Sequence, residues 1–429
     1  MITDGYQNIF KIPELKRRIL FTLAMLAVYR VGVMIPTPGI DSAALARIFE
    51  AHKGGMLGMF NMFSGGALQR LSVFALGIMP YISAAIIIEL LTVVVPYLDE
   101  LKKEGEQGRK KITQYTRYGT VGLSIIQGFL VAVGIEKMGA VINPGWAFRL
   151  MTVITLTAGT SFIMWLGEQI TEKGIGNGIS LIIFAGIVAR MPSAIINTSR
   201  MIASNEMGIF GVVALLVFMV IVVAFIIFME QGQRRIPIQY AKRVVGRRMY
   251  GGQSTYLPLK INTSGVIPPI FASSIMMFPA TVAGFIDIPF VKTASAALMP
   301  GRFAYEVFYV ALIFFFCYFY TAVTFKPDDV ADNMKKQGGY IPGIRPGKKT
   351  ADYIDKVLSR ITLGGAAYVS VVCVLPSILI TKFHVPFYFG GTALLIVVGV
   401  AIDTTAQMET HMIQRSYEGF LKKGIHGHR

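Results

Sequence analysis

Residues Met207–Met229 read MGIFGVVALLVFMVIVVAFIIFM, a run of 23 residues without a charged side chain. A transmembrane helix needs about 20 mostly apolar residues to cross the hydrocarbon core of a bilayer. The run therefore predicts a membrane-spanning helix, and lipid is the expected solvent for much of the chain.

The composition of the whole chain agrees with this prediction. Of its 429 residues, 54% are hydrophobic and only 15% are charged, whereas soluble domains have roughly 25% charged residues. Both cysteines, Cys317 and Cys373, lie inside apolar runs, so we expect buried free thiols. The sequence predicts an all-α integral membrane protein.

The hydrophobic pattern predicts ten membrane spans. The first and fifth are weaker, because they contain Arg30 and Arg190. The predicted spans are 19–35, 71–95, 118–135, 150–166, 178–199, 207–229, 263–286, 307–325, 361–381 and 385–402.

The distribution of Lys and Arg predicts the orientation. The chain has a net charge of +17, and its basic residues divide 30 to 9 between the two sides that ten spans define. Because loops rich in Lys and Arg stay in the cytoplasm, we expect both terminal segments, 1–18 and 403–429, to be cytoplasmic.

Five spans fall in an N-terminal half, 19–205, and five in a C-terminal half, 206–402. An odd number of spans in each half means that two repeats would be inverted in the membrane. Two basic loops, 230–262 and 326–360, have 33 and 35 residues. Loops of this length are usually functional or disordered, so we interpret them as docking surfaces, with simple linkers as the alternative.

The segment Met56–Arg70, MLGMFNMFSGGALQR, is apolar but too short to span a bilayer. It is either an external interfacial helix or a re-entrant element, since half-length backbone at membrane depth is found only inside protein or beside a water cavity. Pro80 and the pair Pro268–Pro269 interrupt the second span of each half, and such paired interruptions indicate a shared central site. Ser83, Ser273 and Ser274 are candidates for hydrogen bonds between helices.

Motifs of enzymes are absent from the sequence. There is no HExxH, and Gly347–Lys348 is followed by Lys349 rather than Ser or Thr, so it fails as a phosphate-binding loop. The GIGNG at Gly174–Gly178 is better interpreted as a helix start with Asn177 near the cap. No metal, cofactor or catalytic group is expected.

Several of these stretches, taken in order, resemble signatures of the SecY family, whose members form the central subunit of the bacterial protein translocation channel. They are FSGGALQRLSVFALGIMPYISAAIII (Phe63–Ile88), ITEKGIGNGISLIIFAGIVA (Ile170–Ala189), GVIPPIFASSIMMFPA (Gly265–Ala280), GGYIPGIRPGKKTADYI (Gly338–Ile354) and GGTALLIVVGVAIDT (Gly390–Thr404).

The resemblance implies two inverted five-helix halves that enclose a central hourglass pore. Its waist would be a ring of aliphatic side chains, which dewets and blocks ions. The ring residues implied by the family are Ile78, Ile82, Ile179, Ile183, Ile270 and Ile396.

The resemblance also implies a plug and a lateral gate. The plug would lie within 56–70 and include Phe60, Asn61, Met62, Phe63, Ser64, Gly65 and Gly66. The gate would open between spans two and seven, with Ser83, Ser273, Ser274 and Phe278 along it.

Further family properties concern partners. The two long loops would dock the SecA motor ATPase and the ribosome through Arg243, Arg247, Arg248 and Arg345, since arginine pairs with carboxylate and with RNA phosphate. The chain would assemble with SecE and SecG in the bacterial inner membrane and handle signal sequences, unfolded polypeptides and membrane lipid. It would be a passive channel rather than an enzyme.

Two positions depart from the family pattern: Glu89 replaces an expected neutral glutamine, and Pro269 stands where a small residue is common. Two other classes of protein remain alternatives. A small-solute transporter would need a charged midplane site, and a membrane-embedded enzyme would need clustered His, Asp or Ser within the spans.

Overall fold

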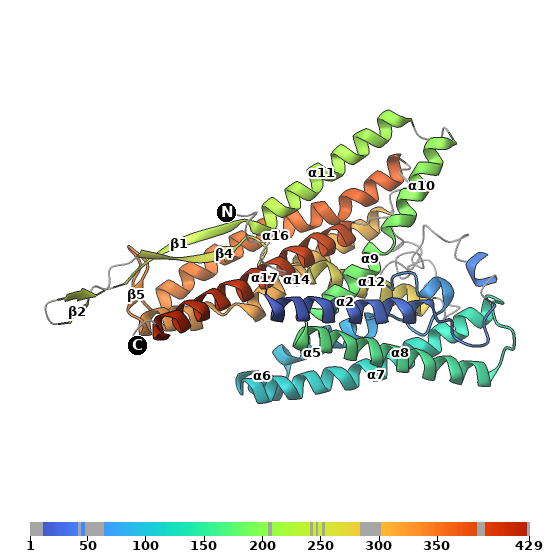
Figure 1. The fold of residues 1–429 in the computed structure, drawn as a ribbon, viewed down its shortest axis with the longest axis horizontal. Coiled ribbons are helices and arrows are strands. Elements are labelled where there is room, and N and C mark those ends of the chain that lie inside the picture. Colours follow the sequence, from blue (N-terminus) through green and yellow to red (C-terminus); the bar gives the residue numbers. More distant parts are fainter. Residues whose placement is uncertain are drawn as a thin grey trace. The chain divides into compact units, whose positions relative to one another are not determined.

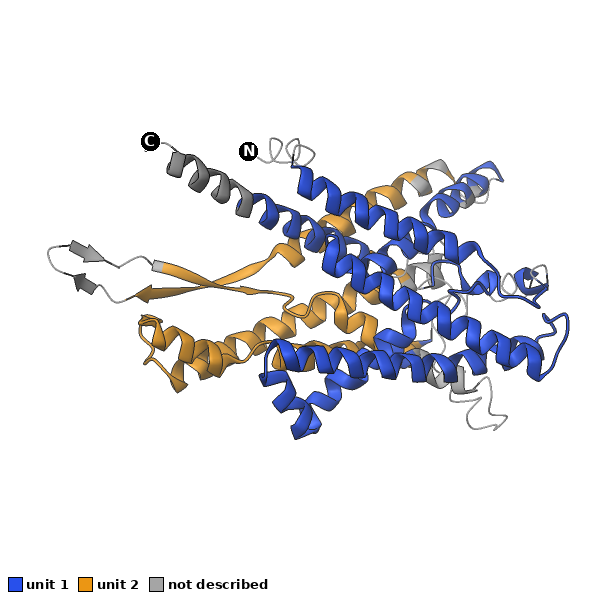
Figure 2. Ribbon diagram, turned by 60° about the horizontal axis from the view of Figure 1, so that its bottom comes forward, with its two compact units in different colours: residues 1–204, 274–302, 396–429 blue, residues 205–273, 303–395 orange. Residues whose placement is uncertain are grey.

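The computed structural model describes residues 12–41, 44–47, 64–204, 208–240, 243–245, 248–250, 254–283, 302–383 and 391–426, which are mostly helical (Figure 1). The chain forms two compact units (Figure 2). Unit 1 comprises residues 1–204, 274–302 and 396–429, and unit 2 comprises residues 205–273 and 303–395.

Unit 1 contains most of the N-terminal helices. They are α2 (Pro13–Met34), the 3₁₀ turn η1 (Leu68–Arg70), α5 (Met79–Val94), α6 (Pro96–Lys103), α7 (Glu106–Lys137), α8 (Trp146–Lys173), α9 (Gly178–Val188) and α10 (Met191–Ala203). Unit 2 contains α11 (Ile209–Gln231), α14 (Phe303–Thr324), α15 (Pro327–Lys336) and α16 (Lys348–Phe383). Two helices, α12 (Ile267–Ala283) and α17 (Gly391–His426), contribute to both units.

Seven of the described helices are long and apolar enough to cross a membrane, and the bent pair α5–α6 makes an eighth. The seven are α7, α8, the stretch of α9 and α10, α11, the stretch of α14 and α15, α16 and α17. The first and seventh predicted spans coincide with α2 and α12. The helical membrane fold is thus confirmed, and the number ten stays a prediction.

The second predicted span begins later than the sequence indicated. Residues 71–78 form turns, with Leu71 in the left-handed region at φ 38°, and α5 begins at Met79. Pro80 therefore starts the helix instead of kinking it, since its missing N–H would be unpaired in a first turn anyway. A second proline, Pro96, begins α6 after a bend of 99°.

The two long loops contain strands that the sequence analysis did not predict. Strands β1 (Gln233–Tyr240) and β4 (Ser254–Lys260) pair antiparallel, and β5 (Gly339–Tyr340) of the second loop joins the other edge of β1. At the tip of the hairpin, β2 (Arg243–Val245) pairs with β3 (Arg248–Tyr250). A half-buried strand is marked by alternating apolar and polar residues. In β1 only Ile236 and Ile238 show this alternation, and both are buried.

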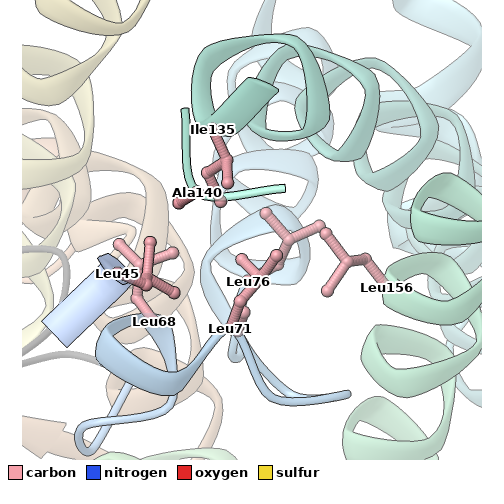
Figure 3. Packing of buried hydrophobic residues seen from close by; sticks show 8 residues of the cluster. Leu45, Leu68, Leu71, Leu76, Ile135, Ala140 and Leu156 are labelled. Carbon is pink, nitrogen blue, oxygen red and sulfur yellow. The ribbon is translucent and has the colours of Figure 1, made fainter. Parts of the chain in front are cut away.

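A hydrophobic cluster in unit 1 fixes the irregular segment that precedes α5. It joins that segment to the end of α7, the connection that follows and α8 (Figure 3). Its buried members are Leu45, Leu68, Leu71, Ala75, Leu76, Ile135, Ala140 and Leu156. The backbone adds hydrogen bonds of 2.8 Å from Thr37 N to Leu71 O and 2.9 Å from Val73 N to Ile35 O.

The last helix extends well beyond the tenth predicted span, 385–402. It runs from Gly391 to His426, so residues 403–426 of the expected terminal tail are helical. Both cysteines are free and buried, as their apolar surroundings predicted.

Candidate pore, plug and docking sites

The described part of the predicted plug is the stretch Ser64–Arg70. Ser64, Gly65 and Gly66 form turns that lead into η1, and Ser64 is 2% exposed. Phe60, Asn61, Met62 and Phe63 lie outside the described residues. Two consecutive residues of α2 contact this stretch: Tyr29 Oη donates to Ser64 O over 3.4 Å, and Arg30 Nη1 donates to Gly65 O over 3.2 Å.

The predicted ring residues lie on four elements. Ile78 is the residue before α5 and Ile82 follows one turn later, while Ile179 and Ile183 are one turn apart on α9. These four and Ile396 of α17 belong to unit 1, whereas Ile270 of α12 belongs to unit 2. All are buried except the half-buried Ile179. Because residues i and i+4 share a helix face, Ile179 and Ile183 face the same side of α9. The closure of all six residues into a ring stays a prediction.

The turn Gly174–Gly178 positions the start of α9. Asn177 caps the helix, as predicted, because its Oδ1 accepts from the backbone N–H groups of Ile179 and Ser180 at 3.1 and 3.3 Å. The Gly178 N–H donates to Thr171 Oγ1 of α8 over 2.9 Å. The helix that carries two ring residues is thereby fixed at its first turn.

The same turn is held between α2 and α17. The Ile175 N–H donates to Thr22 Oγ1 over 3.1 Å, and the Gly176 N–H donates to Gln407 Oε1 over 3.0 Å. Around these bonds Leu15 and Ile175 form a small buried cluster with half-buried neighbours from both helices. Sequence reasoning missed Thr22 and Gln407 because they lie 153 and 231 positions from their partners.

The predicted gate residues lie on α5 and α12. Ser83 is half-buried on α5. On α12, Ser273 is buried and its Oγ donates to Ile270 O of the same helix over 2.9 Å. The expected hydrogen bond from Ser273 to another helix is therefore corrected: its hydroxyl satisfies a backbone carbonyl one turn away. Ser274 and Phe278 also lie in α12.

The two long loops form one structure, which we call the loop body: β1, β4, β5, α15 and the first turns of α16. Its core gathers side chains from both loops, namely Ile236, Ile238, Leu259, Met334, Ile341, Ile354 and Val357. Arg345 is exposed between β5 and α16, and its carbonyl accepts from Thr350 Oγ1 over 3.0 Å. Arg243 and Arg248 lie in β2 and β3, while Arg247 lies outside the described residues.

A polar network joins helices of unit 2 just beyond the loop body. Asn262 Nδ2 donates to Glu230 Oε1 at 2.7 Å and to Gly265 O at 3.0 Å, and Tyr368 Oη donates to Glu230 Oε1 at 3.4 Å. The network links the end of α11, the segment before α12 and α16. No motif marks it in the sequence, because single polar residues at span ends are common.

Glu89, which stands where the family pattern has a neutral glutamine, has a local partner. Glu89 Oε1 accepts from Lys102 Nζ over 3.1 Å, which pairs α5 with α6 across the 99° bend. Among the described residues, no group of three or more His, Cys, Asp or Glu side chains is placed to hold a metal ion.

Many apolar spans, aliphatic pore candidates and an irregular segment packed between spans define a multi-pass membrane channel. The family model described as SecY matches residues 72–405. The chain belongs to the SecY family of protein translocase subunits.

Relatives from bacteria are similar along almost their full length. The protein translocase subunit SecY of Escherichia coli K12 is 55% identical over 420 residues, which is 96% of this chain and 95% of that one. The SecY of Vibrio cholerae is 52% identical over 421 residues, again 96% and 95% of the two chains.

Solved channels share the fold at low sequence identity. A protein-conducting channel is 17% identical, with a TM-score of 0.64 over 93% of each chain. A SecY whose plug domain stabilises its closed state is 18% identical, with a TM-score of 0.66 over 93% of this chain and 92% of that one. Sec61 in the canine ribosome–channel complex is 16% identical, with a TM-score of 0.60 over 93% of each chain.

Proposed function

We propose that this chain forms the pore of a bacterial inner-membrane channel, passes unfolded secretory proteins across the bilayer and releases membrane segments sideways into lipid. The observation that carries the proposal is the 55% identity to a translocase subunit over 95% of that subunit's length. Both termini and the loop body would face the cytoplasm, the side that the excess of Lys and Arg predicts.

The proposed barrier is the ring of Ile78, Ile82, Ile179, Ile183, Ile270 and Ile396. Aliphatic side chains suit this role, because a narrow apolar constriction excludes water and ions. They also yield around an extended polypeptide without offering it a polar group to bind. The small-solute transporter needs an ionisable midplane site instead, and the ring candidates carry no charge.

The proposed side exit lies between α5 and α12. Signal sequences and membrane segments would leave there for lipid, while the plug, 56–70, would close the outer funnel in the resting state. The α5 side of this exit is short, because Pro96 starts a new helix after Val94 rather than extending the old one.

The loop body is the proposed docking surface for large partners. It presents Arg345 on an exposed turn held by a core of its own, and the solved Sec61 relative is part of a ribosome–channel complex. SecA or a translating ribosome would supply the energy, since the channel itself is passive. SecE and SecG would complete the complex.

Crosslinking tests the pore assignment. A secretory chain stalled during translocation would be probed with a photoreactive or thiol crosslinker against Ile82→Cys and Ile183→Cys, after both native cysteines are replaced by serine. We expect adducts at both positions. Ile182→Cys is the matched control, because Ile182 is equally buried but turned about 100° around α9. Equal labelling at Ile182 and Ile183, or none at either ring position, would contradict the pore assignment.

A further inference from the structure

Arg30 places a positive charge within the first predicted span. The residue is half-buried, and its Nη1 donates to Gly65 O over 3.2 Å. No carboxylate of the described residues pairs with Arg30. An ionisable residue inside a span is costly and usually functional. The hydrogen-bond acceptor of the Arg30 guanidinium is a backbone carbonyl within the plug segment.

Tyr29, the residue before Arg30, contacts the same segment and is itself held in place by aromatic neighbours. Tyr29 is 1% exposed and its hydroxyl donates to Ser64 O over 3.4 Å. Its ring stacks on Phe74 at a centroid distance of 6.0 Å, and Phe74 stacks in turn on Phe162 of α8 at 6.0 Å. Because this aromatic row holds the phenol, the hydroxyl is oriented toward Ser64 in advance.

Gly65 packs backbone to backbone against α9. Its φ of +66° lies in the left-handed region, where glycine is favoured. A Cβ added to Gly65 would come within 2.9 Å of Gly186 Cα and 3.2 Å of Arg30 Nη1. Gly186 lies one turn beyond the ring candidate Ile183 on the same helix, so this part of the plug segment packs one helical turn from the proposed waist.

We propose that Tyr29 and Arg30 are positioning residues that hold the plug closed by hydrogen bonding to the carbonyls of Ser64 and Gly65. We call these two hydrogen bonds the plug anchor. The proposal rests on the proposed function, in which 56–70 is the plug. Because both acceptors are backbone atoms, the plug anchor recognises the turn at Ser64–Gly65 and not the plug's side chains, so changes elsewhere in the plug leave it intact.

Two measurements on the assembled, reconstituted channel complex test the plug anchor. The first is ion leak through resting channels, and the second is labelling of Ser64→Cys by a membrane-impermeant maleimide added from the outer side. We expect Arg30→Met to raise both by about tenfold, the factor that corresponds to one lost hydrogen bond to a charged group. Tyr29→Phe should raise both by a smaller factor. The leak and labelling of Arg30→Lys should lie between those of Arg30→Met and the parent.

Arg117→Met is the matched control. It removes an arginine from α7 of the same unit, where Arg117 is half-exposed and pairs with Glu168 over 2.8 Å. We expect parental leak and labelling there. The buried Cys373 should stay unlabelled in every variant, which reports that unit 2 remains folded. Parental leak and labelling in Arg30→Met would overturn the plug anchor. If the parent complex itself translocates no secretory protein, the proposed function fails, while the labelling still reports whether Arg30 holds Ser64 in place.

Discussion

Gly176 donates its backbone N–H to Oε1 of Gln407 over 3.0 Å, although 231 positions separate the two residues. The bond ties the turn before α9 to α17 within unit 1. Both helices carry proposed ring residues, Ile179 and Ile183 on α9 and Ile396 on α17. The spacing of these isoleucines therefore depends on a polar contact outside the ring.

Replacing Gln407 by leucine should disturb that contact. Gly176 is buried, so Gln407→Leu leaves its N–H unpaired and should destabilise the protein by about 1–3 kcal/mol. Thermal unfolding in detergent measures the loss, and ion leak through reconstituted channels measures its effect on the pore. Gln407→Glu keeps an acceptor oxygen and should behave like the parent. Equal stability of the leucine and glutamate variants would show that the bond is unimportant.

Reversing the charge of Arg345 should block docking without affecting the fold. Arg345 is exposed, so Arg345→Glu should leave the complex assembled while SecA-driven export into vesicles falls about tenfold or more, because a charge-assisted contact is lost. Lys349→Glu is the control, since Lys349 is also exposed and lies four residues further along, in α16. Normal export by Arg345→Glu, or an equal loss with Lys349→Glu, would remove Arg345 from the docking site.

Truncating the core of the loop body should loosen both loops together. Ile354 is 0% exposed among side chains from β1, β4 and α15, and such a truncation costs about 2–5 kcal/mol. We expect Ile354→Ala to speed amide hydrogen exchange in β1 and β5 alike. Asp352→Ala alters an exposed neighbour on α16 and should change neither strand. Faster exchange in one strand alone would mean that the two loops open separately.

Removing the charge of Glu89 should have little effect. The side chains of Glu89 and Lys102 are 36% and 35% exposed, and ion pairs this exposed contribute about 0–1 kcal/mol. Glu89→Gln restores the residue expected from the family pattern and should shift unfolding by less than about 1 kcal/mol, with a smaller shift at high salt. A larger shift that persists in salt would assign Glu89 a buried partner.

Local patterns predicted much of the membrane part. Charge-free runs mark spans such as α11 because the bilayer demands them along one continuous stretch, and the cap at Asn177 depends on its nearest neighbours in the chain. The hydrogen bond between Gly176 and Gln407 could not be predicted, because nothing near either residue records its partner. The late start of α5 was missed for a related reason: residues 71–78 are apolar but are held as turns by contacts with distant segments.

The strands of the loop body were missed because their pattern is weak. In β1 the residues Gln233–Arg235 are polar and exposed, and Pro237 argues against a strand. That proline fits the observed sheet, since β5 pairs with β1 only at Gln239 and Tyr240 and leaves the edge at Pro237 free. The pairing of the two loops depends on residues about a hundred positions apart, which local sequence does not encode.

The pairing of β1 with β5 must wait for synthesis of the second loop. Gln239 and Tyr340 are 101 residues apart, so at about 5–20 residues per second the ribosome needs about 5–20 s to deliver β5 after β1. During this interval the outer edge of β1 is open to any other extended chain, and unpaired edges invite aggregation. Pro237 has no N–H to donate to another strand, and Arg234 and Arg235 add charge. These residues oppose pairing of the nascent hairpin with other chains until β5 is synthesised.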